Sequence, residues 1–154
     1  MDRKQRIQEL RRKNKISQLI RKMKIIFNNL REEDFLTIDK ANIIQKNVIS
    51  IMNSMDEQEK SEKYPLDYNY KKWIEDNLKK LKIDFYREFI VYLDLNCETF
   101  AVFLNIDDIF NNIDYIISMT SIENNGSSFI IINDKLTTGL CLWRTEYEIM
   151  GYKW

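Results

Sequence analysis

The chain has 154 residues, 24 basic and 24 acidic side chains, and a hydrophobic fraction of 44%. This length and composition suit one globular domain with a real core and exclude disorder over the whole chain. There is no histidine, and the three glycines form no phosphate-binding or dinucleotide-binding loop, which disfavours His-dependent nucleophiles, common zinc sites and most nucleotide-dependent enzymes. No apolar run is long enough to span a bilayer or to form a signal peptide, so we expect a cytoplasmic protein.

The zero net charge hides an uneven distribution. Residues 1–24, the basic head, hold ten basic and two acidic side chains, a net charge of +8. The other 130 residues therefore carry −8, and residues 97–154 alone hold eight acids and three bases. This segregation predicts that the two ends of the chain meet different partners, or each other.

Apolar spacing predicts three helices in the first half of the chain. Apolar residues between Ile16 and Leu30 recur at helical spacing, which predicts a helix near 5–30. A second helix is predicted at 39–55, capped by Thr37 or Asp39, and a third at 67–82, capped by Asp67. The polar stretch 56–63 before Pro65 is interpreted as a linker.

The second half favours antiparallel strands. Segments 89–95 and 99–104 are predicted to form a hairpin joined by residues 96–98, followed by a short helix capped by Asp107 and Asp108. Segments 128–132 and 140–149 are predicted as a second hairpin.

In the last of these strands, period-two alternation defines two faces. One face is expected in the core and contains Cys141, Trp143, Thr145, Tyr147 and Ile149. The other begins apolar and becomes charged, with Leu140, Leu142, Arg144, Glu146 and Glu148.

These elements predict an α+β fold, with the helices on one face of a four- to five-stranded antiparallel sheet. We expect a single domain over 1–154, mostly helical in 1–82 and mostly antiparallel strands with one short helix in 83–154. Cys97 and Cys141 fall in predicted strand regions and lack CxxC spacing, so buried free thiols are expected rather than a disulfide.

The basic head is a candidate nucleic-acid surface, since clustered bases bind phosphates in a salt-dependent way. Its candidate contacts are Arg11, Arg12, Lys15 and Lys22. The alternative is an ordinary solvated helix face, because basic stripes are common on exposed helices.

The acidic residues of the second half allow two interpretations. As oxygen ligands they suit magnesium, but their spacing matches no metal-nuclease motif, so neither a metal site, a cofactor nor a catalytic residue is predicted. As a surface they could bind a basic protein, with aromatic side chains as anchors. The candidate partner-binding residues are Asp94, Glu98, Asp134, Arg144, Glu146, Glu148, Tyr152 and Trp154. The alternative is an ordinary solvated sheet face.

The tail combines the strand Phe129–Ile132, a turn with Asp134, and the segment Gly139–Tyr147, with Trp154 at its end. This pattern resembles the closing hairpin of small bacterial immunity proteins encoded beside contact-dependent growth inhibition systems and other polymorphic toxins. The resemblance implies a non-enzymatic inhibitor that binds one cognate toxin domain, often a nuclease, and blocks its active site or substrate surface.

We therefore expect a cognate toxin domain as the partner, no membrane association, and an undetermined oligomeric state. The first alternative is a small nucleic-acid-binding or phage-type inhibitor protein that acts through the basic head. The second is a metal-dependent enzyme.

Overall fold

The computed structural model describes residues 2–81, 87–123 and 128–154. It divides the chain into two compact units, Met1–Phe35 and Leu36–Trp154. The expectation of a single domain over residues 1–154 stays a prediction. Among the described residues, no helix combines the length and apolar character that crossing a membrane requires.

The first unit consists mainly of helix α1 (Arg3–Met23), followed by the short 3-10 helix η1 (Glu32–Asp34). Asp2 caps α1 through a capping box with Gln5. The predicted helix was too long at its end: α1 stops at Met23, and residues 24–30 continue as turns. Asn28 and Asn29 lie there, and asparagine favours turns over helix interiors.

The second unit contains a six-stranded antiparallel sheet in the order β1-β6-β5-β4-β2-β3, as far as the described residues show. The strands are β1 (Glu62–Tyr64), β2 (Glu88–Leu95), β3 (Glu98–Asn105), β4 (Ser128–Ile132), β5 (Gly139–Arg144) and β6 (Ile149–Lys153). The helices are α2 (Ile38–Glu57), α3 (Tyr70–Leu81), α4 (Ile106–Asn111) and α5 (Ile113–Ser118). The predicted α+β class is confirmed.

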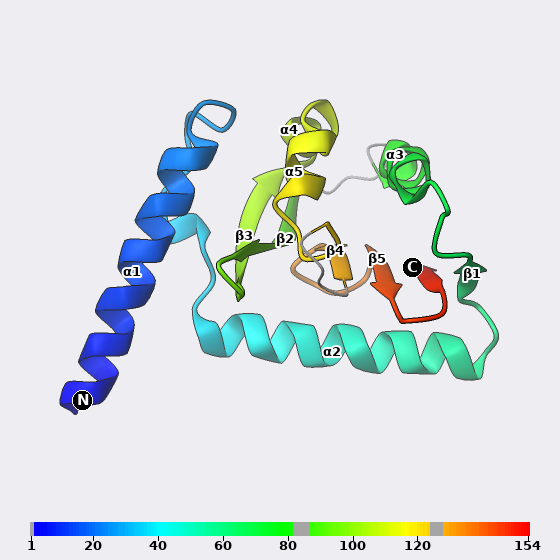
Figure 1. Cartoon of the computed structure of the whole chain (residues 1–154), viewed down its shortest axis with the longest axis horizontal. Helices are drawn as coiled ribbons and strands as arrows, with labels where there is room; N and C mark the ends of the chain where they lie inside the picture. Colours follow the sequence, from blue (N-terminus) through cyan, green and yellow to red (C-terminus); the bar gives the residue numbers. More distant parts are fainter. Residues whose placement is uncertain (1, 82–86, 124–127) are drawn as a thin grey trace. The chain divides into compact units, whose positions relative to one another are not determined.

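Helices cover both faces of this sheet, with α2 on one face and α3, α4 and α5 on the other (Figure 1). The prediction of helices on one face only was therefore wrong. The strands explain the difference, because residues 89–93 and 129–132 are buried without a break, as in strands covered on two sides.

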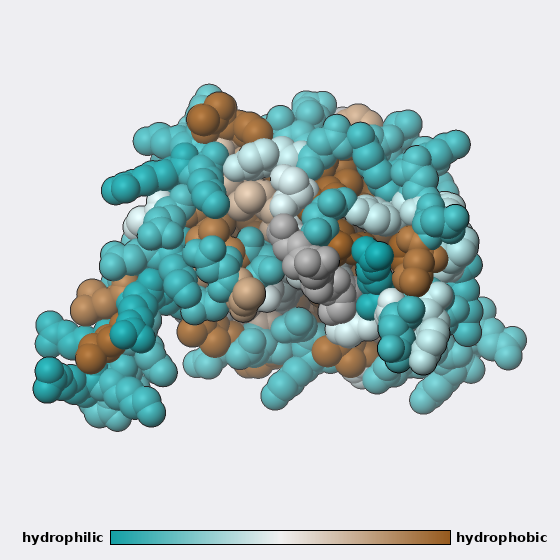
Figure 2. Space-filling view, in the orientation of Figure 1, coloured by the Kyte–Doolittle hydropathy of each residue, from teal (hydrophilic) through white to brown (hydrophobic). Residues whose placement is uncertain are grey.

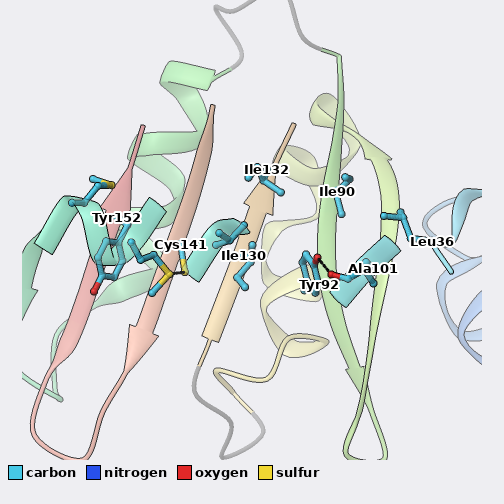
Figure 3. Close-up of a cluster of buried hydrophobic side chains, with 12 residues drawn as sticks. Leu36, Ile90, Tyr92, Ala101, Ile130, Ile132, Cys141 and Tyr152 are labelled. Atoms are coloured by element: carbon cyan, nitrogen blue, oxygen red, sulfur yellow. Dashed lines mark hydrogen bonds between the residues drawn. The ribbon is translucent and has the colours of Figure 1, made fainter. Parts of the chain in front are cut away.

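On the α2 face, a cluster of buried side chains joins the helix to five strands of the sheet, part of which Figure 3 shows. The hydroxyl of Tyr92 donates a hydrogen bond to the carbonyl oxygen of Ala41 at 2.7 Å, which ties β2 to α2. The Cys141 sulfur lies 3.5 Å from that of Met52. The helix is thus fixed by apolar packing together with these contacts to β2 and β5.

The predicted strand 140–149 proved to be two strands joined by a turn. β5 ends at Arg144, and β6 begins at Ile149 and pairs back on β5. Cys141 and Ile149 are buried, as predicted for the core face, but Leu140 and Leu142 of the other face are buried as well. Tyr147, which was predicted to lie in the core, is 80% exposed, so this part of the prediction was wrong.

The sheet gains its sixth strand from the predicted linker, where β1 pairs with β6. The second and third helices agree better with their predictions. Helices α2 and α3 lie close to their predicted ranges, and Thr37 caps α2. The predicted end of the third helix at Lys82 lies outside the described residues.

Two predicted caps were wrong. The side chain of Asn69 accepts the hydrogen bond of the Lys72 backbone at the start of α3, in place of Asp67. Asn105 caps α4, while Asp107 and Asp108 lie in its first turn, where their charges suit the helix dipole.

The hairpin β2–β3 forms as predicted, with Leu95 opposite Glu98. Its two central residues, Asn96 and Cys97, both have positive φ, at 52° and 63°, as a type I′ turn requires. Cys97 is exposed in this turn, against the prediction of a buried thiol, whereas Cys141 is buried. Both thiols are free, as expected.

Candidate surface at the turn end of the sheet

Strand pairing brings two turns to one end of the sheet. Tyr64 pairs with Ile149, Ser128 pairs with Trp143, and β2 runs antiparallel to β4. One end of the sheet therefore holds the β2–β3 turn, the β5–β6 turn and the last residue of β1, and we call it the turn end. Both turns lie at the bottom of Figure 3.

The turn end collects five of the eight predicted partner-binding residues. They are Asp94, Glu98, Arg144, Glu146 and Glu148. Glu98, Arg144 and Glu146 are exposed. Asp94 is partly buried, and this burial raises the pKa of its carboxyl group. Glu148 is partly buried and lies 3.9 Å from the ammonium group of Lys63.

The other three predicted residues lie elsewhere. Asp134 is exposed in the β4–β5 loop at the opposite end, where Trp154 packs beside Gly139. Tyr152 was wrongly placed on the surface: it is 3% exposed, and its hydroxyl donates to Asp56 at 3.1 Å. Burial of this phenol, together with Asp56, raises its pKa. The eight residues therefore do not form one patch.

Tyr147 is the exposed aromatic residue that the sequence analysis missed. The preceding Thr145 closes the β5–β6 turn, because its hydroxyl accepts from the backbone N–H groups of Tyr147 and Glu148 at 3.2 and 3.0 Å. The Thr145 N–H also donates to the carbonyl oxygen of Glu148 at 2.9 Å. A threonine that bonds the backbone two residues on is a turn signal that could have corrected the strand prediction.

On strand β1, the side chain of Glu62 joins this strand to β6 and to α3. Its carboxylate accepts hydrogen bonds from the Trp73 indole at 2.7 Å and from the Tyr64 hydroxyl, and it pairs with Lys153. Burial raises the pKa of Glu62, but these bonds outweigh burial and lower it to about 2. Glu62 thus holds the edge strand to its neighbours.

A hollow of about 420 Å³ lies between the start of α3 and helix α5. Its lining consists of Tyr68, Asn69, Tyr70, Lys71, Asp114, Ile117, Ser118 and Glu123. The Tyr68 ring stacks on that of Tyr64, with centroids 4.0 Å apart. The Tyr70 hydroxyl donates to Glu123, and burial followed by this bond raises the pKa of Tyr70 to about 12. Sequence reasoning missed this site, because its residues come from three separate segments.

Neither of the alternative functions, metal binding and nucleic-acid binding, is supported by an assembled site among the described residues. Among the residues described, no group of three or more Cys, Asp and Glu side chains is placed to hold a metal ion. In the basic head, Arg11 and Lys22 are exposed on α1, while Arg12 and Lys15 are partly buried. These four side chains are distributed along the helix from Arg11 to Lys22.

No curated protein and no solved structure is significantly similar to this chain. One family model, described as YxiF protein, matches residues 19–154. The match covers the turn end and the hollow, and it leaves Arg11, Arg12 and Lys15 outside. Because it spans most of the sequence, the chain belongs to the YxiF protein family.

Proposed function

We propose that this protein is an immunity protein, a non-enzymatic module that binds and neutralises a cognate toxin domain through the turn end of its sheet. The observation that carries the proposal is the display of Tyr147, which is 80% exposed on a turn closed by Thr145. A side chain this exposed adds little to the core of the fold and is available to a partner.

A fixed aromatic side chain is well suited to protein recognition. Tyrosine is enriched among the residues that dominate binding energies, and it has few rotatable bonds to immobilise. The turn presents Tyr147 between Glu146 and Glu148, with Arg144 just before it. Charges around an aromatic anchor steer the approach of a complementary partner and discriminate against others.

The charges at this end favour a basic partner surface. Glu98 and Glu146 are exposed there, and Asp94 lies nearby on β2. A nuclease domain holds its phosphate substrate in a positively charged groove. The acidic side chains would occupy such a groove, and Tyr147 would supply the apolar burial.

The test starts with a search of the genes that neighbour the gene of this protein for a candidate toxin domain. The toxin domain is expressed in a bacterial host with and without the protein, and growth and direct binding are measured. We expect restored growth and a stable complex. Growth arrest that persists at equal expression, with no complex by size-exclusion chromatography, contradicts the proposal.

The second candidate function is nucleic-acid binding through the basic head. The observation that favours it is the exposure of most residues of the first half of α1, where bases dominate; this mostly hydrophilic segment is seen at the lower left of Figure 2. It ranks second because three of its four candidate residues lie outside the family match. Salt-dependent binding of a fluorescent RNA or DNA oligonucleotide, lost in Arg11→Glu, would favour this function over the first.

A further inference from the structure

We infer that the hollow between α3 and α5 receives a cationic side chain of the partner protein, an arginine or lysine, between tyrosine rings and the carboxylate of Glu123. The inference rests on the proposed function, because it assigns a specific contact to that interaction. It adds a site outside the β5–β6 turn and states the chemistry that would fill it.

The floor and walls of the hollow suit the long apolar stem and flat head of arginine. Ile117, which is 4% exposed, contributes an apolar surface. Tyr68 is held in place by its stack on Tyr64, with an angle of 7° between the ring planes. A cation over a tyrosine face is attracted by the ring quadrupole, and guanidinium groups use this contact more often than ammonium groups.

Two carboxylates, those of Asp114 and Glu123, and one ammonium group, that of Lys71, line the hollow. This balance favours a cation over an anion, although the positive charge of Arg144 acts on Tyr70 from outside the lining. Lys71 is already offset by two carboxylates, that of Asp114 at 2.5 Å and that of Glu75 at 4.0 Å. Glu123 accepts its hydrogen bond from the neutral Tyr70 hydroxyl, a contact that leaves its negative charge in place. Glu123 is exposed, so this charge is accessible to a ligand.

The geometry also connects the hollow to the turn end. The hydroxyl of Ser121, two residues before Glu123, donates to the carbonyl oxygen of Ser128 at 2.9 Å, and Ser128 pairs with Trp143, the residue before Arg144. Arg144 belongs to the end of β5, directly before the turn that carries Tyr147. A partner anchored on Tyr147 can therefore place a basic side chain in the hollow at the same time.

The hollow is tested with N-acetyl-arginine amide as the probe, titrated into the isotope-labelled full chain by NMR. We expect saturable shifts of the Tyr68, Tyr70 and Ile117 amides in the millimolar range, and none with N-acetyl-glutamate amide. Glu123→Gln should weaken binding of the probe at least threefold. Glu57→Gln, which removes an exposed carboxylate from α2 on the other face of the sheet, should leave the affinity unchanged.

Three results overturn the inference: no saturable shift, equal affinity in both variants, or binding of inorganic phosphate in place of the arginine probe. An unchanged amide spectrum outside the hollow shows that Glu123→Gln is folded. Failure of the inference is separable from failure of the proposed function. If the protein neutralises the toxin but the hollow does not bind the arginine probe, only the inference is wrong. If the hollow binds the probe but the protein neutralises no toxin, only the proposed function is wrong.

Discussion

The indole ring of Trp154 lies against Gly139, and the two residues exchange both backbone hydrogen bonds. The Gly139 N–H donates to the Trp154 carbonyl at 2.9 Å, and the Trp154 N–H donates to the Gly139 carbonyl at 3.2 Å. The indole N–H donates to the Leu136 carbonyl at 3.1 Å. A methyl group on Gly139 would lie 2.6 Å from the nearest ring carbon, so only glycine leaves room for this packing.

Gly139→Ala should therefore lower the free energy of unfolding by about 1–3 kcal/mol, the range for forcing an extra methyl group into a packed site. Urea denaturation followed by circular dichroism measures the change. In the Trp154→Ala background the same substitution should cost much less, because the clash is removed. Equal costs in the two backgrounds would show that the ring does not constrain Gly139.

Glu62 should make the protein sensitive to acid. The pKa of Glu62 is about 2 in the folded state against its ordinary value of 4.5, so its stabilising contribution is present above about pH 4.5 and is lost as pH falls toward 2. We expect Glu62→Gln to cost about 1–2 kcal/mol at neutral pH, allowing for solvent screening of the 32% exposed side chain.

Urea unfolding of the wild type and of Glu62→Gln at pH 7 and pH 2.5 measures the contribution of Glu62 to stability. The difference in unfolding free energy should narrow at the lower pH, because at pH 2.5 the Glu62 carboxyl group is protonated in the unfolded chain and begins to be protonated in the folded protein. Glu57→Gln, at the exposed end of α2, gives the baseline for the loss of one surface carboxylate. A difference that stays constant with pH would show that the carboxylate charge of Glu62 does not stabilise the fold.

The sequence predicted the elements whose signals are local. Helix α2 and strand β4 appeared at their predicted places, because a capping threonine and a run of β-branched residues act within the segment itself. Strand β1 could not be predicted. Its three residues, Glu62 to Tyr64, form a strand only because β6 pairs with them and Glu62 bonds Trp73 and Lys153, all distant in sequence.

The two thiols should differ sharply in reactivity. Cys97 is exposed in the β2–β3 turn, whereas Cys141 is buried, and burial raises the pKa of its thiol. Because the thiolate is the reactive form, a thiol reagent should modify Cys97 in the native protein and Cys141 only on unfolding. Mass spectrometry identifies the modified residue. Rapid native modification of Cys141 would contradict its burial beneath α2.

The candidate site was only partly predictable. Alternation correctly indicated that Arg144 and Glu146 are accessible, but it continued the strand through Thr145 and so placed Tyr147 in the core. The same error put Trp143 fully in the core, whereas it is partly buried. Period-two patterns describe a strand well but do not show where it ends, and that depends here on the side-chain bonds of one threonine.

Tyr147→Ala should weaken toxin neutralisation while leaving the fold intact. The side chain is 80% exposed, so its removal should change the free energy of unfolding by no more than about 0.5 kcal/mol. Truncating an anchoring aromatic residue at an interface costs about 2 kcal/mol or more, which is roughly a thirtyfold loss of affinity. Glu146→Lys should weaken binding as well, because it opposes a basic partner with a like charge.

Growth protection, the dissociation constant and a thermal melt are measured together for these variants. Arg11→Glu with Lys15→Glu is the matched control, since it reverses two charges on α1 and leaves the turn end unchanged. We expect this control to protect as the wild type does, because the family match begins after both residues. Should the α1 variant fail while Tyr147→Ala protects normally, the binding surface is the basic head, and the turn end is only a part of the fold.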